Sequence, residues 1–585
     1  MSTMHSDKLT RYRNAQHPIP QKMLRWHLYG AGLENLGKNG QPEDVPVPEP
    51  GDDELLVRID ALGLCFSDTK VVSLGEKHPR LVGRDLQKEP VVLGHEVSCT
   101  VVKVGKNLQQ RFHVGQRFIV QADVFYKGKS IAYGYVLPGA MTQYGIIGKE
   151  IIEGDEGCYL LPLQDKDGYV EAALVEPWAC VVASYSQKRR QHIRHDGVAL
   201  LIMGERVPHT EFTLGEAVTA SQRPRKVVAL SAGGQVRAEL VRLVADTGME
   251  LVEDESTIDA ARRHAPEGGY DDILCIGELP PEAIEGVADL LAKGGVLWVL
   301  RRTPFERCLS LDIGRIHYDN LWVVGAFSDN LTDANAIPLR SELLSGGTCW
   351  IVGGGGPMGQ MHVQRAVQLP EPPSLIVATD VDAVRLEAVR ERYAPTAERR
   401  GIRFVTLNPK EFEPQAFHQK LLELTNGKGF TDIVNMVPVA DVVADSAQLL
   451  ADGGVYNIFA GVARGVKACL DVNAICGRGV RFFGSSGSSL ADIRLTLEQM
   501  ESGQLQTRAS LAAIGGMKAA HEGIKALMEA RFPGKTVIFP QIPDLPLMSL
   551  AELKEKFPTV YAKLENGRFW TKEAEEELLR LLLPE

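Results

Sequence analysis

The chain has 585 residues, a formal net charge of -11, 44% hydrophobic residues and 24% charged residues. This length predicts several folded units with ample core volume, and an acidic chain without a basic run interleaved with aromatics argues against a nucleic-acid partner. No apolar run approaches the roughly 18 residues that a membrane span requires, and residues 1–8 lack the apolar region of a signal peptide. We therefore expect a cytoplasmic protein.

The cysteines favour the same compartment. Nine are present, scattered singly and with no Cys-x-x-Cys spacing. An odd number without a framework spacing predicts reduced thiols in a reducing compartment rather than a disulfide scaffold, and excludes a four-cysteine structural zinc lobe. The positions are 65, 99, 158, 180, 275, 308, 349, 469 and 476.

The first 190 residues or so read as a β-rich region after a polar arm. Residues 1–22 are rich in His, Gln and Pro, which predicts an extended arm. Residues 55–59 have the apolar content of a strand, and residues 63–68 form a loop-like stretch with a thiol, a hydroxyl and a carboxylate. Residues 172–180 resemble the start of a helix. A small antiparallel barrel with loops at one end fits this pattern.

A Gly-His-Glu triplet at residues 94–96 follows the apolar run 91–93. An imidazole and a carboxylate side by side, just after a strand-like segment, can bind one Zn²⁺ from a rigid element. The triplet alone is a weak signal, because a surface pair at a strand end has the same sequence. Further ligands elsewhere in the chain would have to support a metal site.

The remainder of the chain alternates strands with helices and contains an internal repeat. Four short segments recur in the same order, at offsets of about 150 to 160 residues. The matched starting pairs are Gly197 with Gly347, Asp272 with Asp432, Gly294 with Gly453, and Gly325 with Gly484. We infer two consecutive βαβ domains of the same kind.

The second copy has the features of a dinucleotide site. A strand at 349–352 leads into a glycine-rich turn and a helix-like run at 361–366, whose N-terminus offers N–H donors to a pyrophosphate. Asp380 follows the next strand, about 20 residues after the last glycine, where a carboxylate would hold a ribose 2′-hydroxyl. The turn residues are Gly354, Gly356, Pro357, Met358 and Gly359.

The first copy departs from this pattern where chemistry would be done. Arg206 stands opposite Gly356, His209 opposite Gly359, and Ser231 replaces Asp380. With the turn and the acid both missing, we predict that this copy does not bind a dinucleotide in the usual way. A structural or dimer-forming spacer is one interpretation, and an anion site using Arg206 or His209 is the other.

Taken together, these motifs resemble the zinc-dependent medium-chain dehydrogenases/reductases in content and order. Residues 82–85 and 532–540 are most similar to the sorbitol dehydrogenase and L-sorbose 1-phosphate reductase branch. The resemblance covers roughly residues 23–190 and 346–545, so the first βαβ copy is an insertion. It implies an α/β fold with a GroES-like β-rich catalytic domain and two consecutive Rossmann-type domains, the first degenerate.

The resemblance also assigns site residues. Cys65, His95 and Glu96 become zinc ligands, and Glu176 a fourth ligand or the residue that exchanges with water. Ser67 becomes the catalytic proton acceptor, and Asp68 an orienting partner of the ligands. We expect one catalytic zinc and no structural zinc, since residues 121–140 contain no cysteine.

Asp380 favours NAD over NADP, because a 2′-phosphate would meet a carboxylate, whereas Arg385 nearby could accommodate that phosphate. The expected boundaries place an N-terminal arm at 1–22, the catalytic domain at 23–190, the degenerate copy at 191–345, the NAD-binding domain at 346–490, and a return to the catalytic domain with a helical extension, including a helix at 572–583, at 491–585.

We thus predict a zinc- and NAD-dependent oxidoreductase that interconverts the secondary alcohol and ketone of a polyol, sugar or sugar phosphate. We expect a homo-oligomer, a dimer or tetramer, with no membrane partner. Two alternatives stay open: an NAD-using lyase or epimerase with transient oxidation, and a dinucleotide-binding sensor without turnover. Net NADH production separates the first alternative, and zinc content separates the second.

Overall fold

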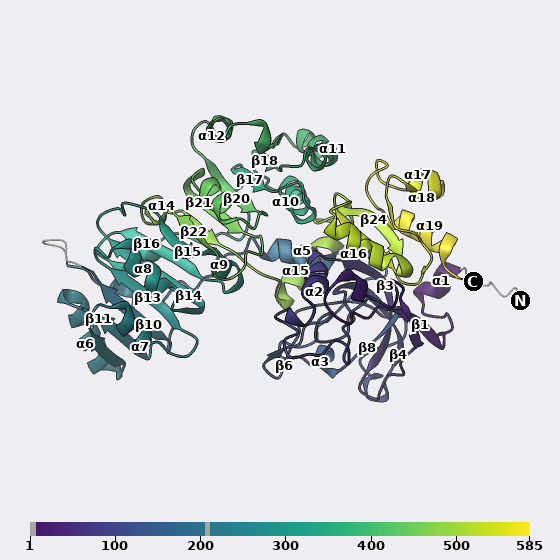
Figure 1. Ribbon diagram of the computed structural model, residues 1–585, viewed down its shortest axis with the longest axis horizontal. Coiled ribbons are helices and arrows are strands. Elements are labelled where there is room, and N and C mark those ends of the chain that lie inside the picture. The colour runs from purple at the N-terminus through teal and green to yellow at the C-terminus, as the bar shows by residue number, and fades with distance from the viewer. Residues whose placement is uncertain (1–7, 205–210, 585) are drawn as a thin grey trace, which may run out of the picture. The chain divides into compact units, whose positions relative to one another are not determined.

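The computed structural model describes residues 8–204 and 211–584, which divide into two compact units. Unit 1 contains the described residues of 1–183, 356–370 and 487–585, and unit 2 contains those of 184–355 and 371–486. Within the described ranges, no helix has the length and apolar content needed to cross a membrane. The chain is an α/β protein in which each unit has its own sheets (Figure 1).

Unit 1 is built on an eight-stranded sheet in the order β26-β24-β25-β3-β4-β5-β9, with β8 paired to β3 outside this path. The neighbours are antiparallel except β24 and β25. The strands are β3 (Leu55–Leu64), β4 (Glu96–Val104), β5 (Arg117–Val120), β8 (Tyr144–Ile147), β9 (Leu160–Pro162), β24 (Leu511–Gly516), β25 (Lys535–Phe539) and β26 (Met548–Ser549). The short strands β1 (Lys22–Arg25) and β2 (Glu43–Pro46) pair separately, as do β6 (Phe125–Tyr126) and β7 (Lys129–Ser130).

Strand β3 is the centre of this sheet, and all ten of its residues are buried. Its register places Gly63 opposite Glu96 at the start of β4, and Leu64 opposite Thr536 of β25. Three segments that are far apart in sequence therefore meet at the C-terminal end of β3. Because both faces of the strand are covered, a slip of register would bury or expose the wrong side chains.

Two expectations for the first part of unit 1 were wrong. The described part of the polar arm contains a helix, α1 (Lys8–Arg13), in which Leu9 and Tyr12 are buried and the Tyr12 hydroxyl donates to Asp60 Oδ1 at 2.8 Å. The stretch 63–68 is not a loop either, because β3 runs to Leu64 and α2 (Phe66–Leu74) begins directly after Cys65. Burial of Leu9 and Tyr12 stabilises α1 despite its polar sequence, and α2 begins where Asp68 accepts the backbone N–H of Cys65 at 3.0 Å.

Unit 1 also contains several helices. They are α3 (Lys149–Ile152), α4 (Tyr169–Ala173), α5 (Val175–Ala183), α10 (Pro357–Gln368), α15 (Leu490–Glu501), α16 (Ala520–Met528), α17 (Leu553–Lys556), α18 (Pro558–Tyr561) and α19 (Lys572–Leu582). The helix expected at 572–583 is confirmed as α19. Its buried Glu575 accepts the backbone N–H groups of Tyr169 at 2.6 Å and Val170 at 2.8 Å, so the C-terminal helix is held at the start of α4.

Unit 2 contains two six-stranded sheets with the same strand order, β12-β11-β10-β13-β14-β16 and β19-β18-β17-β20-β21-β23. Every pairing within them is parallel. The central strand is the first in sequence and the order reverses beside it, which is the Rossmann arrangement. The predicted pair of consecutive copies is therefore confirmed.

The elements of unit 2 follow the repeat. The first copy has β10 (Val198–Met203), β11 (Lys226–Leu230), β12 (Glu250–Asp254), β13 (Tyr270–Ile276), β14 (Leu291–Arg301) and β16 (Trp322–Phe327), with α6 (Gly234–Thr247), α7 (Ile258–Arg263), α8 (Pro281–Ala288) and α9 (Ile313–Tyr318). The second has β17 (Thr348–Val352), β18 (Leu375–Thr379), β19 (Arg403–Leu407), β20 (Phe430–Asn435), β21 (Leu450–Ile458) and β23 (Arg481–Phe483), with α11 (Ala383–Arg399), α12 (Pro414–Leu424), α13 (Ala440–Ala447) and α14 (Val472–Arg478).

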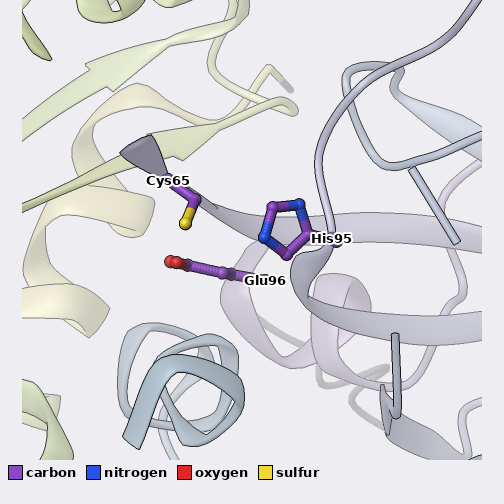
Figure 2. A group of neighbouring side chains, drawn as sticks. All are labelled: Cys65, His95 and Glu96. Carbon is purple, nitrogen blue, oxygen red and sulfur yellow. The ribbon is translucent and has the colours of Figure 1, made fainter. Parts of the chain in front are cut away.

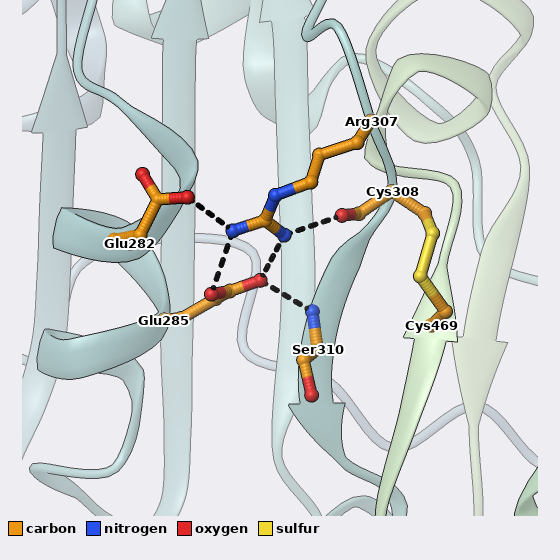
Figure 3. Close-up of a disulfide and its surroundings, with 6 residues drawn as sticks. All are labelled: Glu282, Glu285, Arg307, Cys308, Ser310 and Cys469. Carbon is orange, nitrogen blue, oxygen red and sulfur yellow. Dashed lines mark hydrogen bonds and ion pairs between the residues drawn. A yellow bond between two sulfur atoms is a disulfide. The ribbon is translucent and has the colours of Figure 1, made fainter.

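The two copies are joined by a small antiparallel pair, β15 (Leu309–Asp312) with β22 (Lys467–Leu470). A disulfide between Cys308 and Cys469 crosses this pair (Figure 3). The expectation that all thiols are reduced was wrong for these two cysteines. They are 161 residues apart in sequence, and only the pairing of β15 with β22 brings them together.

Candidate metal centre and dinucleotide turn

The residues at the C-terminal end of β3 form a group suited to a metal ion. Cys65 follows β3, His95 precedes β4, and Glu96 is the first residue of β4. One ligand atom from each lies within 4.8 Å of the other two, and His95 and Glu96 are buried. Figure 2 shows the thiol, the imidazole and the carboxylate gathered around one space. The structure thus brings together three of the four predicted ligands.

The donor set fits Zn²⁺. Bond lengths of about 2.0 to 2.3 Å place the ligand atoms of a tetrahedral zinc roughly 3.3 to 3.8 Å apart, so the group, whose ligand atoms lie within 4.8 Å of one another, would contract around the ion. Glu96 Oε2 is buried and has no hydrogen-bond partner among the described residues. Its other oxygen, Oε1, accepts from Lys535 Nζ at 2.5 Å. The ion pair therefore leaves the second oxygen available to a cation.

Both nitrogens of His95 face polar groups from α2. Ser67 Oγ lies 3.2 Å from Nε2, and Asp68 Oδ1 lies 3.3 Å from Nδ1. Burial acts to lower the pKa of His95, but the Tyr135 phenol and the Asp68 carboxylate raise it above its ordinary value. A carboxylate on the far nitrogen is the partner that orients a metal-binding imidazole. Asp68 and Ser67 thus both lie beside His95, and their roles as orienting residue and proton acceptor stay predictions.

Glu176 lies in the first turn of α5 and is buried, but it is not part of the close three-residue group. Burial raises its pKa to about 7, with Glu96 and Asp123 adding to this and His95 opposing it. The Glu176 carboxyl therefore interacts electrostatically with His95 and Glu96 of the metal group. Its role as a ligand or as a residue that exchanges with water stays a prediction.

Three residues near this group were missed at the level of sequence. Lys535 is buried, and while burial lowers its pKa, Glu96 and Cys65 raise it above the ordinary value. The buried Tyr135 packs its ring 5.5 Å from His95, and the Arg80 guanidinium lies 4.7 Å from the centre of the same ring. Lys535 lies in the segment 532–540 used for the family resemblance, but nothing in that segment indicates its partner. Tyr135 and Arg80 lie in stretches without a recognisable spacing.

The glycine-rich turn leads from β17 into α10, a helix that begins at Pro357 with Gly356 as its N-cap. Proline suits this first position because its missing N–H has no partner inside a helix. At Gly355, an added Cβ would lie 2.7 Å from Asp380 Oδ2, so the turn passes directly against this carboxylate. The tight passage of the backbone agrees with a dinucleotide turn, and the binding of a pyrophosphate there stays a prediction.

Asp380 lies after β18 and is mostly buried, accepting from the backbone N–H of Gly355 at 3.0 Å and of Asp382 at 3.0 Å. Arg385 lies in the first turn of α11, and its Cβ would be 2.8 Å from a Cβ on Gly355. The acid and the arginine thus flank the same turn. This geometry accommodates the ribose contact expected of Asp380 and leaves the NADP alternative of Arg385 in place.

The first copy has Ser231 at the position of Asp380. The Ser231 N–H donates to the carbonyl of Asp254, the last residue of β12, as the Asp380 N–H donates to Leu407, the last residue of β19. The Ser231 hydroxyl accepts the N–H of Ser256 at 3.0 Å. Arg206 and His209 lie outside the described residues, so the anion site suggested for them stays a hypothesis.

Comparison with known proteins agrees with these observations. Residues 51–153 match the family model described as the alcohol dehydrogenase GroES-like domain. The chain is 24% identical over 553 residues to mannitol-1-phosphate 5-dehydrogenase from Aliivibrio fischeri, covering 93% of this chain and 95% of that protein. These similarities agree with the resemblance to the medium-chain dehydrogenases/reductases.

Two further comparisons are informative. L-sorbose 1-phosphate reductase from Klebsiella pneumoniae is 23% identical over 540 residues, covering 92% of the chain and 94% of that protein. A solved alcohol dehydrogenase from Thermotoga maritima is 13% identical, with a TM-score of 0.50, covering 89% of the chain and all of that structure. The first supports an alcohol dehydrogenase-type enzyme, and the second shows the fold alone.

Proposed function

We propose that the chain is a zinc- and NAD(H)-dependent oxidoreductase that interconverts the secondary alcohol and the ketone of a polyol, sugar or sugar phosphate. The observation that carries this proposal is the grouping of Cys65, His95 and Glu96 within 4.8 Å, with Ser67 3.2 Å from His95. The dinucleotide turn before α10 and Asp380 supply the other half of the chemistry.

Each residue has a defined task in this reaction. Cys65, His95 and Glu96 would hold the metal ion, Asp68 orients His95, and the Ser67 hydroxyl receives the proton of the alcohol while passing its own proton outward. When bound, Zn²⁺ supplies a Lewis acid that acidifies a hydroxyl and polarises a carbonyl. A nicotinamide cofactor held at the turn before α10 would supply the hydride acceptor, so that oxidation of the alcohol to a ketone would be balanced by reduction of NAD⁺ to NADH.

The mannitol-1-phosphate and L-sorbose 1-phosphate relatives motivate the inclusion of sugar phosphates. Arg80 supports this choice, because its guanidinium lies on Tyr135, whose ring also packs on His95. A guanidinium presents paired donors that match phosphate oxygens. Arg80 already pairs with Asp123 at 2.7 Å, and its side chain retains 39% exposure from which a phosphate could be reached.

The test is zinc content together with NADH formation on a panel of polyols and their phosphates. We expect stoichiometric zinc and a rise in NADH absorbance with at least one secondary alcohol. Cys65→Ser should lose both zinc and activity, whereas Cys158→Ser, a control at a free thiol outside the group, should keep both. Purified protein that binds no zinc, even after zinc is added, would refute the proposal. Product formation without net NADH would instead indicate the lyase or epimerase reaction.

A further inference from the structure

The two α/β copies of unit 2 meet through equivalent residues. In the antiparallel pair of β15 and β22, Ser310 lies opposite Cys469. These two residues have the same separation as Gly325 and Gly484, which the sequence repeat aligns, so they occupy the same place in their copies. A contact centred on equivalent residues is what a two-fold axis between two subunits produces.

The contacts on either side of this pair are reciprocal. A Cβ added to Gly325 of the first copy would lie 2.6 Å from Cys476 Sγ of the second, and one added to Gly484 would lie 2.8 Å from His317 Cα. His317 and Cys476 are themselves equivalent in the repeat. Each copy therefore presents a glycine to the same helix position of the other, α14 in one direction and α9 in the other.

A second set of contacts follows the same rule. Asn473 holds the Phe305 backbone, accepting its N–H at 2.7 Å and donating to its carbonyl at 2.9 Å. Gly314, the equivalent of Asn473, lies against Ala463 and Arg464, and Arg464 is the equivalent of Phe305. Such exchanged contacts define an isologous interface, in which residue i meets j and j meets i.

The interface has the character of a permanent one. One continuous apolar cluster contains buried side chains from both copies, and the rings of Trp322 and Phe483 stack with their centroids 5.8 Å apart. At its edge, Lys467 of the second copy pairs with Asp289 of the first at 2.8 Å. The Cys308–Cys469 disulfide adds a covalent link (Figure 3). Obligate subunit interfaces resemble a domain core in this way.

We propose that the first copy is a built-in partner subunit for the second. It occupies, within one chain, the self-complementary face through which the dinucleotide-binding copy would otherwise pair with an equivalent domain of another chain. A copy with this task needs its interface but no cofactor site, which agrees with Ser231 in the place of Asp380. The partner is a segment of the same chain, so the pairing does not depend on protein concentration.

Zero-length carbodiimide cross-linking of Lys467 to Asp289 tests whether the two copies that meet belong to one chain. Wild-type protein should give the Lys467–Asp289 cross-linked peptide. Two full-length variants, Lys467→Ala and Asp289→Ala, are then co-expressed, each with its own affinity tag, and both are purified from the same cells. Each chain lacks one member of the pair, so only an interface between chains can produce the peptide. Both side chains are partly exposed, and their removal should leave the fold intact.

We expect the cross-linked peptide in the wild type and its loss to background in the co-expressed variants. Its appearance in the co-expressed variants would overturn the proposal, because the face would then join two chains. Its absence from the wild type would also overturn it, since the two copies would not meet as described. The pair Lys226–Glu250, 2.8 Å apart inside the first copy, is the control and should cross-link in every sample.

Discussion

Lys535→Met removes the cation that neutralises Glu96. The two side chains are 5% and 0% exposed, and their charged atoms are 2.5 Å apart. At an effective dielectric constant of about 20, their attraction is roughly 7 kcal/mol. Part of this is offset by the desolvation of both ions, and removing one partner of a buried pair costs about 3 to 5 kcal/mol. We expect a loss of this size in the free energy of unfolding of zinc-free protein, measured by denaturant titration.

Zinc should reduce this loss, because a cation bound to Glu96 replaces the missing ammonium. The difference in unfolding free energy between wild type and Lys535→Met should therefore be smaller with zinc than with chelator. In the zinc-free double variant with Glu96→Gln, much of the loss should be recovered, which gives the coupling of the pair directly. Lys518→Met is the matched control, since its partner Asp544 is exposed, and it should change stability by less than about 1 kcal/mol. An equal loss with and without zinc would refute Glu96 as a ligand.

Four further outcomes are expected. Ser67→Ala should lower kcat by about 100-fold or more while zinc content stays unchanged; unchanged kcat would remove Ser67 from the proton path. Asp380→Ser should raise the KM for NAD by about tenfold, because roughly one hydrogen bond to the ribose is lost, and should change the KM for NADP little. An equal rise in both KM values would contradict the ribose contact. Arg80→Ala should raise KM about 10- to 100-fold for a phosphorylated substrate and leave the unphosphorylated one unchanged, whereas a uniform rise would indicate a structural role. Burial raises the pKa of Glu575 from 4.5 to about 7. The folded state therefore holds a proton that the unfolded state has lost between these two pH values. The free energy of unfolding should fall by on the order of 3 kcal/mol as the pH rises through this range. Glu575→Gln should remove most of that slope, and an unaltered slope would assign it to other groups.

The sequence predicted the parts of this protein whose chemistry is local. His95 and Glu96 are adjacent, and Ser67 and Asp68 follow Cys65 within three positions, so a motif could carry them. The repeat was also visible, because Gly and Asp residues at strand ends recur with nearly constant spacing. The structure confirms two consecutive domains of the same kind, and their two sheets have the same strand order. It brings Cys65 to the His-Glu pair as the resemblance implied.

What the sequence could not predict depends on distant pairing. Lys535 and Glu96 are separated by 439 positions and meet only because β25 and β4 flank β3. Cys308 and Cys469 look like isolated thiols until β15 and β22 pair. The helix α1 has a polar sequence, and its position is determined by the contact of Tyr12 with the buried Asp60. In each case the deciding interaction lies in another part of the chain, where no local propensity records it.

The pairing of β3 with β4 has a consequence for where this chain tolerates changes in length. Gly63 lies opposite Glu96 through a ladder of hydrogen bonds that extends to Leu55 and Val104. One residue inserted or deleted inside either strand would turn the side chains beyond that point to the opposite face and move Glu96 away from Cys65. The exposed residues 87–89 lie outside this ladder and apart from Ser67, Asp68 and Arg80, so a change of length there can leave the distance between the ligands preserved.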